Sequence, residues 1–202
     1  MKRIVIVGAG AHGAIVADIL RDHAGFVDDR PSRPVLGPIA ALPDIEHDAV
    51  IVAIGDNHLR RIMIEKLLAL GERLATAIHP FASVSPSASI GEGSMISAGA
   101  IVLPRAVIGR GVILNTKSSV DHDSSVGDFG HVGPGATVGG NARVGEETLI
   151  GLGASVMSGV AVGARSIIGA GAVVVRDIPD DVTAFGVPAR ITSDRRSEAP
   201  SR

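Results

Sequence analysis

Aliphatic residues recur at every sixth position over nearly half of the chain. Val, Ile or Leu occupies sixteen consecutive positions of this register, from Val84 to Val174. A period of six is neither the 3.6 residues of a helix nor the 2 residues of a half-buried strand, so the backbone must return to one environment once per short strand and turn. Three hexads make one triangular coil of eighteen residues, and the fifteen full hexads therefore predict a solenoid of about five coils.

Two other positions of the hexad carry information about the solenoid. The residue after the aliphatic is Gly nine times, and we expect these glycines to supply turns with positive φ. Four positions after each of the first fifteen aliphatics stands Ala, Ser, Thr or Val, with Gly130 as the single exception, and such small side chains fit a narrow interior. The spacing leaves the handedness open, although parallel crossovers are right-handed in almost all folds.

The first eighty residues show a different pattern, in which apolar β-branched runs alternate with helical segments. Residues 3–7 lead into GAGAHG at 8–13 and then into an amphipathic helix, and another apolar strand is expected at 49–54. This strand, glycine turn and helix can hold an anionic oxygen on backbone amides. The predicted fold class is α/β plus all-β: a small Rossmann-like βαβαβ domain at 1–80, a parallel β-helix at 81–191 and a flexible tail at 192–202.

Polar residues follow the predicted strands at one edge of this small domain. Asp28 and Asp29 come about twenty residues after the first Gly of the turn, where an acid can accept a hydrogen bond from a sugar hydroxyl. His12 lies inside the turn and either caps the helix or touches a phosphate or sugar. Fewer than ninety residues precede the solenoid, which suits one nucleoside diphosphate linked to a sugar better than NAD. Arg60 and Arg61 are expected to be solvated or to flank the pocket.

Composition narrows the function further. The formal net charge is −2 and no basic tract occurs beyond Arg195 and Arg196, so nucleic acid is not an expected partner. The chain contains no Cys, which excludes thiolate catalysis and Cys-ligated metals and is compatible with the cytoplasm, the expected location. No run approaches the ~18 apolar residues of a membrane span.

The repeats contain only two histidines, His122 and His131, both in an unusually polar stretch. His122 is flanked by Asp121 and Asp123, which suits a general base near neutral pH, although a solvated corner histidine has the same neighbours. The two histidines are nine residues apart, half of a coil, so they face opposite sides of one chain. A closed three-fold oligomer would place active sites at subunit interfaces. Two histidines are too few for the three-His zinc site of γ-carbonic anhydrases, and no metal is expected.

Several motifs together resemble one family. They are GAGAHG at 8–13, Asp28-Asp29, IGDN at 54–57, IHP at 78–80, the stretch 114–140 that contains VDHD, and GVPAR at 186–190. This set resembles the bacterial sugar acetyltransferases that join a small Rossmann-like domain to a left-handed β-helix of hexapeptide repeats. The resemblance implies a left-handed coil, a homotrimer, and direct transfer from acetyl-CoA to the amino group of a nucleotide-linked 4-amino-4,6-dideoxy sugar.

The resemblance also implies roles for individual residues. His122 would be the catalytic base, Asp123 would raise its basicity, and His131 would contact the acetyl group. The CoA groove would run past Leu152 and Ala170. Contacts with the nucleotide sugar would fall on Gly10, Ala11, His12, Asp28, Asp29 and Gly55. Two alternatives remain open: O-acetylation of sialic acid or another sugar hydroxyl, and a non-enzymatic scaffold or sugar-nucleotide sensor.

Overall fold

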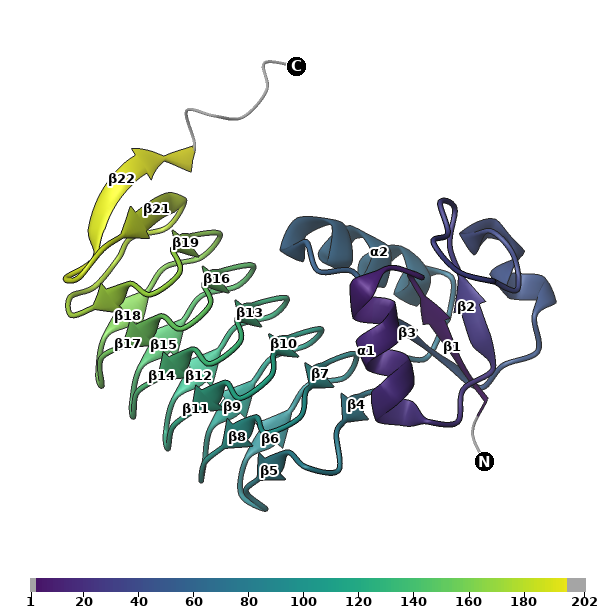
Figure 1. The fold of residues 1–202 in the computed structure, drawn as a ribbon, viewed down its shortest axis with the longest axis horizontal. Helices are drawn as coiled ribbons and strands as arrows, with labels where there is room; N and C mark the ends of the chain where they lie inside the picture. Colours follow the sequence, from purple (N-terminus) through teal and green to yellow (C-terminus); the bar gives the residue numbers. More distant parts are fainter. Residues whose placement is uncertain (1–2, 196–202) are drawn as a thin grey trace.

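The computed structural model describes residues 3–195, and the N-terminal part is a small parallel sheet with two helices (Figure 1). The strands β1 (Ile4–Val7), β2 (Gly25–Val27) and β3 (Ala49–Val52) pair in the order β2-β1-β3. Helix α1 (Ala11–Leu20) connects β1 to β2, and α2 (Asn57–Ala69) follows β3. Between β2 and β3 the 3₁₀ helix η1 (Ile39–Asp44) stands in place of the second α-helix of the expected βαβαβ order, since Pro43 lies inside it and cannot donate to an α-helical ladder.

The remainder is the left-handed parallel β-helix, built from three sheets of two-residue strands. The long sheet contains β4 (Ala77–Ile78), β7 (Met95–Ile96), β10 (Ile113–Leu114), β13 (His131–Val132), β16 (Leu149–Ile150) and β19 (Ile167–Ile168). The six-stranded sheet contains β5 (Ser83–Val84), β8 (Ile101–Val102), β11 (Ser119–Val120), β14 (Thr137–Val138), β17 (Ser155–Val156) and β20 (Val173–Val174). The five-stranded sheet contains β6 (Ser89–Ile90), β9 (Val107–Ile108), β12 (Ser125–Val126), β15 (Arg143–Val144) and β18 (Ala161–Val162).

The predicted stacking of aliphatic residues is confirmed. Neighbouring strands pair residues eighteen positions apart, so that Leu114 lies beside Val132 and Val132 beside Ile150, all fully buried. The register begins one hexad earlier than the sequence analysis placed it, because Ile78 pairs with Ile96. The ladder of the β-helix therefore starts in β4, which ends at Ile78, before the predicted boundary at 81.

The explanation given for the glycines of the repeat is wrong. Positive φ occurs at the third residue after each aliphatic, at all fourteen such positions from Gly93 to Gly171, and half of these are not Gly. The glycines directly after the aliphatics have no positive φ. Instead they lie against the next coil: an added Cβ at Gly127 would lie 2.6 Å from the backbone N of Glu146. Close approach of two backbones, and not turn conformation, requires them.

The last coil is covered by an antiparallel strand pair, β21 (Val182–Phe185) and β22 (Arg190–Asp194). The tail predicted to be flexible from 192 onward therefore begins as a strand, because the backbone of 190–194 finds hydrogen-bonding partners along β21. This pair extends the long sheet at the top end of Figure 1, where the final strand would otherwise present an unpaired edge. Residues 196–202 lie outside the described residues.

The two parts of the molecule share hydrophobic cores. Phe129, at the tip of a coil, is only 5% exposed and packs with Ile64 and Leu67 of α2 in the core of the N-terminal sheet. On the other face of that sheet, Met95 and Ile113 of the long sheet pack with residues of α1. The N-terminal part is thus fixed against the long sheet and the coil tips beside it. Within the described residues no helix is long and apolar enough to cross a membrane.

Candidate active site

The sequence-predicted base, His122, stands at the coil corner between the six-stranded and five-stranded sheets. Its side chain is half exposed, and its Nδ1 lies 2.8 Å from Oδ2 of Asp123. An ionised carboxylate only accepts hydrogen bonds, so Nδ1 carries the proton and Nε2 of the neutral ring keeps its lone pair. The structure thus brings His122 and Asp123 together in the tautomer that a general base needs.

The free Nε2 atom of His122 faces the next coil. An added Cβ at Gly140, eighteen residues further on, would lie 2.8 Å from Nε2, so the ring packs against Gly140 and leaves no room for a larger side chain there. Asp121 lies on the other side, with Oδ1 4.0 Å from Nε2 and 2.6 Å from the backbone N of His122.

A residue that the sequence analysis missed completes this corner. Arg105 donates from Nε to Oδ1 of Asp123 at 2.6 Å and from Nη2 to Oδ2 at 2.7 Å. The Arg105 guanidinium, together with the hydrogen bond from His122, holds the pKa of Asp123 well below its usual range. Asp123 consequently stays ionised beside His122 at any physiological pH.

His131 lies on β13, on the face of the long sheet that meets the N-terminal part. Its Nε2 is 3.2 Å from Nδ2 of Asn115, and the backbone of Gly55 forms a hydrogen bond with the ring. Burial, with the nearby charge of Arg60, lowers the pKa of His131 to about 3. This histidine is therefore neutral, and its neighbours differ from those of His122.

The predicted substrate residue His12 stands beside His131. The two rings meet edge to face with centroids 5.8 Å apart, and an added Cβ at Gly55 would lie 2.6 Å from the His12 ring. Burial and the charge of Arg60 lower the pKa of His12. Nε2 of His12 is buried and has no hydrogen-bond partner among the described residues, so it is a donor or acceptor left for another molecule.

The glycine turn has the expected shape for an anion site. Helix α1 begins at Ala11 with Gly10 as its N-cap and without a side-chain cap, so its first amides are unpaired by side chains. Gly10 is exposed and has open space beside it, whereas a Cβ at Gly13 would collide with the carbonyl oxygen of Gly8. Arg33, missed by the sequence analysis, donates to the carbonyls of Ala9 at 2.7 Å and Gly10 at 3.3 Å and adds a positive charge.

The two acids predicted to bind substrate are occupied with the backbone in this structure. Asp28 accepts from the amide of Ala9 at 2.6 Å and from that of Arg30 at 2.7 Å, and Asp29 accepts from the amide of Ile39 at 2.9 Å. Their geometry shapes the loops around the glycine turn. Each oxygen retains a further lone pair, so a contact with a sugar hydroxyl stays a prediction.

A cleft of about 290 Å³ separates the start of α2 from the long sheet. It is lined by Gly55 and His58 on one side and by His131, Leu149 and Ile167 on the other. The cleft therefore continues from the group formed by His12, Gly55 and His131 toward later coils. Size and position suit part of a sugar or of a pantetheine chain.

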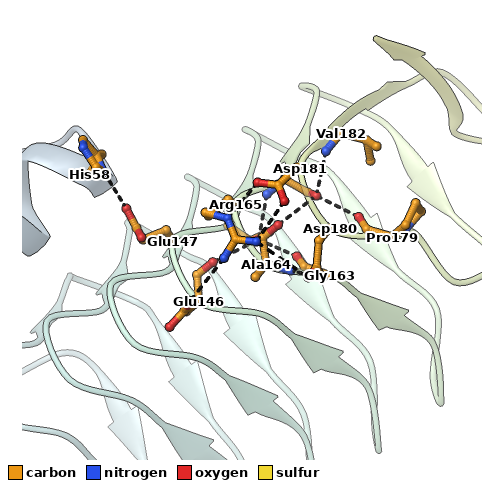
Figure 2. A network of polar contacts seen from close by, with 12 residues as sticks. His58, Glu146, Glu147, Gly163, Ala164, Arg165, Pro179, Asp180, Asp181 and Val182 are labelled. Atoms are coloured by element: carbon orange, nitrogen blue, oxygen red, sulfur yellow. Dashed lines mark hydrogen bonds and ion pairs between the residues drawn. The ribbon is translucent and has the colours of Figure 1, made fainter. Parts of the chain in front are cut away.

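Ion pairs hold the rim of this cleft (Figure 2). Arg165 pairs with both oxygens of Asp181 at 2.7 and 2.8 Å, which raises the pKa of Arg165 above its ordinary value. Glu147 joins α2 to the coil tips, with Oε2 3.0 Å from Nδ1 of His58 and Oε1 3.0 Å from Nε of Arg61. These charges are paired with one another and shape the rim.

Arg60 occupies the junction of the two parts and is 1% exposed, which excludes the solvated position, one of the two alternatives expected for it. Its guanidinium donates to the carbonyls of Ile54 and Gly55 at the end of β3, and to those of Gly111 and Phe129 on the coils. Helix α2 begins next to the coil tips, so the Arg60 side chain lies between the helix and the coils. Burial lowers the pKa of Arg60 to about 10, so it remains charged.

The predicted CoA-binding residues lie at a third place. Leu152 and Ala170 are exposed and eighteen residues apart, stacked at the corner between the long sheet and the six-stranded sheet. His122 lies at a different corner, the one between the six-stranded and five-stranded sheets. Within residues 3–195 no hydrogen bond or ion pair joins His122 to His131 or to the glycine turn. The same part of the chain contains no group of three His, Asp or Glu side chains that could hold a metal ion.

Comparison with known proteins agrees with this arrangement. The family model of the PglD N-terminal domain matches residues 3–67. The UDP-N-acetylbacillosamine N-acetyltransferase of Bacillus subtilis (strain 168) is 38% identical over 116 residues, which are 48% of this chain and 52% of that protein. The match thus spans about half the length of this curated relative.

Two solved structures resemble the whole chain. The acetyltransferase domain of PglB from Neisseria gonorrhoeae FA1090, in complex with acetyl coenzyme A, is 41% identical with a TM-score of 0.90, covering 95% of this chain and 99% of that one. A mutant of the perosamine N-acetyltransferase from Caulobacter crescentus, in complex with CoA and GDP-perosamine, is 42% identical with a TM-score of 0.93, covering 96% of this chain and 98% of that one. The chain belongs to this family of sugar N-acetyltransferases. Membership in this family explains why the glycine turn at 8–13 and a β-helix occur in one chain.

Proposed function

We propose that this family member transfers the acetyl group of acetyl-CoA to the amino group of a nucleotide-linked 4-amino-4,6-dideoxy sugar. The observation that carries the proposal is the half-exposed His122, whose Nδ1 is bound by an ionised Asp123 and whose Nε2 lies beside Gly140. The solved relatives bind acetyl coenzyme A in one case and CoA with GDP-perosamine in the other. A scaffold or sensor would not need a base in this tautomer at an open corner.

The reaction is a single displacement. The neutral amine adds to the thioester carbon, a C–N bond forms, and Nε2 of His122 accepts the proton that the nitrogen loses. The C–S bond then breaks, and the CoA thiolate leaves and takes up a proton. Asp123 stabilises the imidazolium form of His122 while the proton is held. General base catalysis of this kind contributes ~10²–10⁴-fold to the rate, and orientation of the two substrates contributes much of the rest.

The N-terminal part would bind the nucleotide. The uncapped start of α1 at Gly10 and Ala11 and the Arg33 guanidinium provide positive potential for a diphosphate. His12, with its unpartnered Nε2, would meet the sugar or a phosphate oxygen, and Gly55 keeps the space open for the His12 ring. A free sugar such as sialic acid would have less use for such a turn, which favours the nucleotide-linked amine over O-acetylation.

A homotrimer with active sites between subunits is part of the proposal. His122 lies at a different corner from Leu152 and Ala170, and its described contacts are all with other coil residues. A neighbouring prism can bring its own long sheet and glycine turn to this corner, as a closed three-fold ring requires. Because acetyl-CoA is the donor, the proposed location is the cytoplasm.

The substrate assignment is tested by incubating the protein with acetyl-CoA and UDP-, GDP- and dTDP-linked 4-amino sugars while free thiol is followed. We expect thiol release with at least one amine, with an acetylated product in the mass spectrum. His122→Asn should lower kcat by ~10²-fold or more while CoA still binds. Thiol release with sialic acid but with none of the amines would favour O-acetylation. Full turnover in His122→Asn would exclude His122 as the base.

The shared site is tested by mixing two inactive variants. His122→Asn lacks the base, and Gly10→Phe fills the exposed, open space at the start of α1. If each site takes His122 from one subunit and the glycine turn from another, randomly mixed trimers should regain about a quarter of the activity, since one interface in four then has both parts intact. No recovery in verified mixed trimers would place the whole site within one chain.

A further inference from the structure

The corner that carries His122 holds one cationic group, Arg105, that has no assigned role in the reaction. Its side chain is 64% exposed, and Asp123 is its one side-chain partner among the described ion pairs. Exposed ion pairs contribute only ~0–1 kcal/mol to stability, so holding the fold together is a weak reason for this geometry. The pair is nevertheless bidentate at 2.6 and 2.7 Å, the arrangement with the strongest directional preference.

The backbone brings Arg105 to this place. Arg105 and Asp123 are both the third residue after an aliphatic, and both have positive φ, +60° and +57°. They occupy equivalent positions in consecutive coils, so their side chains leave the corner in parallel. The amide of Asp123 also donates to the carbonyl of Pro104 at 3.1 Å, which fixes the separation of the two turns.

We propose that Arg105 is a positioning residue for catalysis, which orients the Asp123 carboxylate toward Nδ1 of His122 and offsets its negative charge. This role rests on the proposed function of His122 as the base. The Oδ2 atom of Asp123 accepts from Arg105 and from His122 at once, so the guanidinium fixes the carboxylate plane that the imidazole meets.

The charge of Arg105 has a second consequence. The charged groups around His122 are Asp121 and Asp123 on its own turn and Arg105 on the preceding coil, while the following coil offers only Gly140. Arg105 therefore offsets part of the negative charge that the two carboxylates place beside the ring.

The test compares Arg105→Gln and Arg105→Lys with the wild-type protein, by kcat and KM with the best amine substrate. Arg105→Gln should lower kcat by about tenfold at an unchanged KM for the amine. Arg105→Lys keeps the charge and loses the bidentate geometry, so its kcat should also fall. KM for acetyl-CoA and the melting temperature should change little in either variant.

Arg110→Gln is the matched control, because Arg110 is also a coil-tip arginine with one carboxylate partner, Glu92 at 3.4 Å, and lies at a different corner. Its kcat and KM should match those of the wild type. An active wild-type protein with unchanged kcat in Arg105→Gln would overturn the positioning role. An equal fall of kcat in Arg110→Gln would show a general charge effect and overturn it as well. Absence of turnover in the wild-type protein would instead refute the proposed function itself.

Discussion

Arg60 should be the most stabilising polar residue at the junction of the two parts, and Arg60→Met tests this. The guanidinium is buried and donates to carbonyls of both parts, including those of Gly111 and Phe129 at 2.8 and 2.7 Å. Within residues 3–195 it forms no ion pair with a carboxylate. The methionine side chain is nearly as long as that of arginine but donates no hydrogen bond. The backbone carbonyls that Arg60 pairs with stay in place and lose their donor.

The magnitude follows from those carbonyls. Two of them, on Gly111 and Phe129, have no other donor in the described chain, and each buried unpaired acceptor costs about 1–3 kcal/mol. The sum is about 2–6 kcal/mol, and the desolvation that lowers the pKa of Arg60 to about 10 offsets part of it. We therefore expect a loss of about 3 kcal/mol, or about 6–12 °C in melting temperature for a chain of this size.

Thermal and urea unfolding at one protein concentration measure this loss. Lys66→Met is the matched control, since Lys66 is exposed on the same helix and its replacement removes the same charge and adds the same side chain. Its cost should stay below about 1 kcal/mol, the usual scale for a cation in the last turn of a helix. Melting temperatures within 2 °C of each other for the two variants would refute the argument from buried carbonyls.

Two other consequences can be measured directly. Gly140→Ala should lower turnover by about tenfold or more at an unchanged melting temperature, because the added Cβ would lie 2.8 Å from Nε2 of His122; an unchanged kcat would contradict the placement of that ring. The protein should also lose stability as the pH falls from about 6.5 toward 3. The pKa of His131 is lowered to about 3 in the folded chain, so within this window the unfolded chain binds a proton at His131 and the folded chain does not. The slope of unfolding free energy against pH should be smaller in His131→Gln, and identical slopes would contradict the assignment.

The β-helix could be predicted from the sequence because its information is local and repeated. Each hexad specifies one short strand, and the partner of any residue lies eighteen positions away, so a register of aliphatics also fixes the ladder. The reason for each glycine could not be read in the same way. Glycine permits both a positive φ and a close backbone approach, and only the coordinates show that Gly127 and its equivalents serve the second purpose.

The contact between the two parts could not be predicted because its acceptors are backbone atoms. Arg60 is a charged residue of a helix, and the two coil carbonyls that receive its hydrogen bonds, on Gly111 and Phe129, lie more than fifty positions away. Every residue has a backbone carbonyl, so the residue type does not show which carbonyl will accept a hydrogen bond. One signal was present: Phe129 is the single aromatic residue of the repeat region, and Gly130 is the exception at the small-residue position, so this coil tip departs from the pattern where it enters the N-terminal core.

The position of Arg105 follows from the register itself. Residues 105 and 123 are eighteen apart and occupy the same place in consecutive coils, so stacking in eighteens predicts that their side chains meet, as they do. The same rule pairs Arg165 with residue 183, yet its bidentate partner is Asp181. The difference arises because β19 pairs with β21 at an offset of sixteen, where the chain leaves the repeat after Val174. The eighteen-residue rule therefore holds from Ile78 to Val174 and ends there, and the corner that carries His122 lies well inside its range.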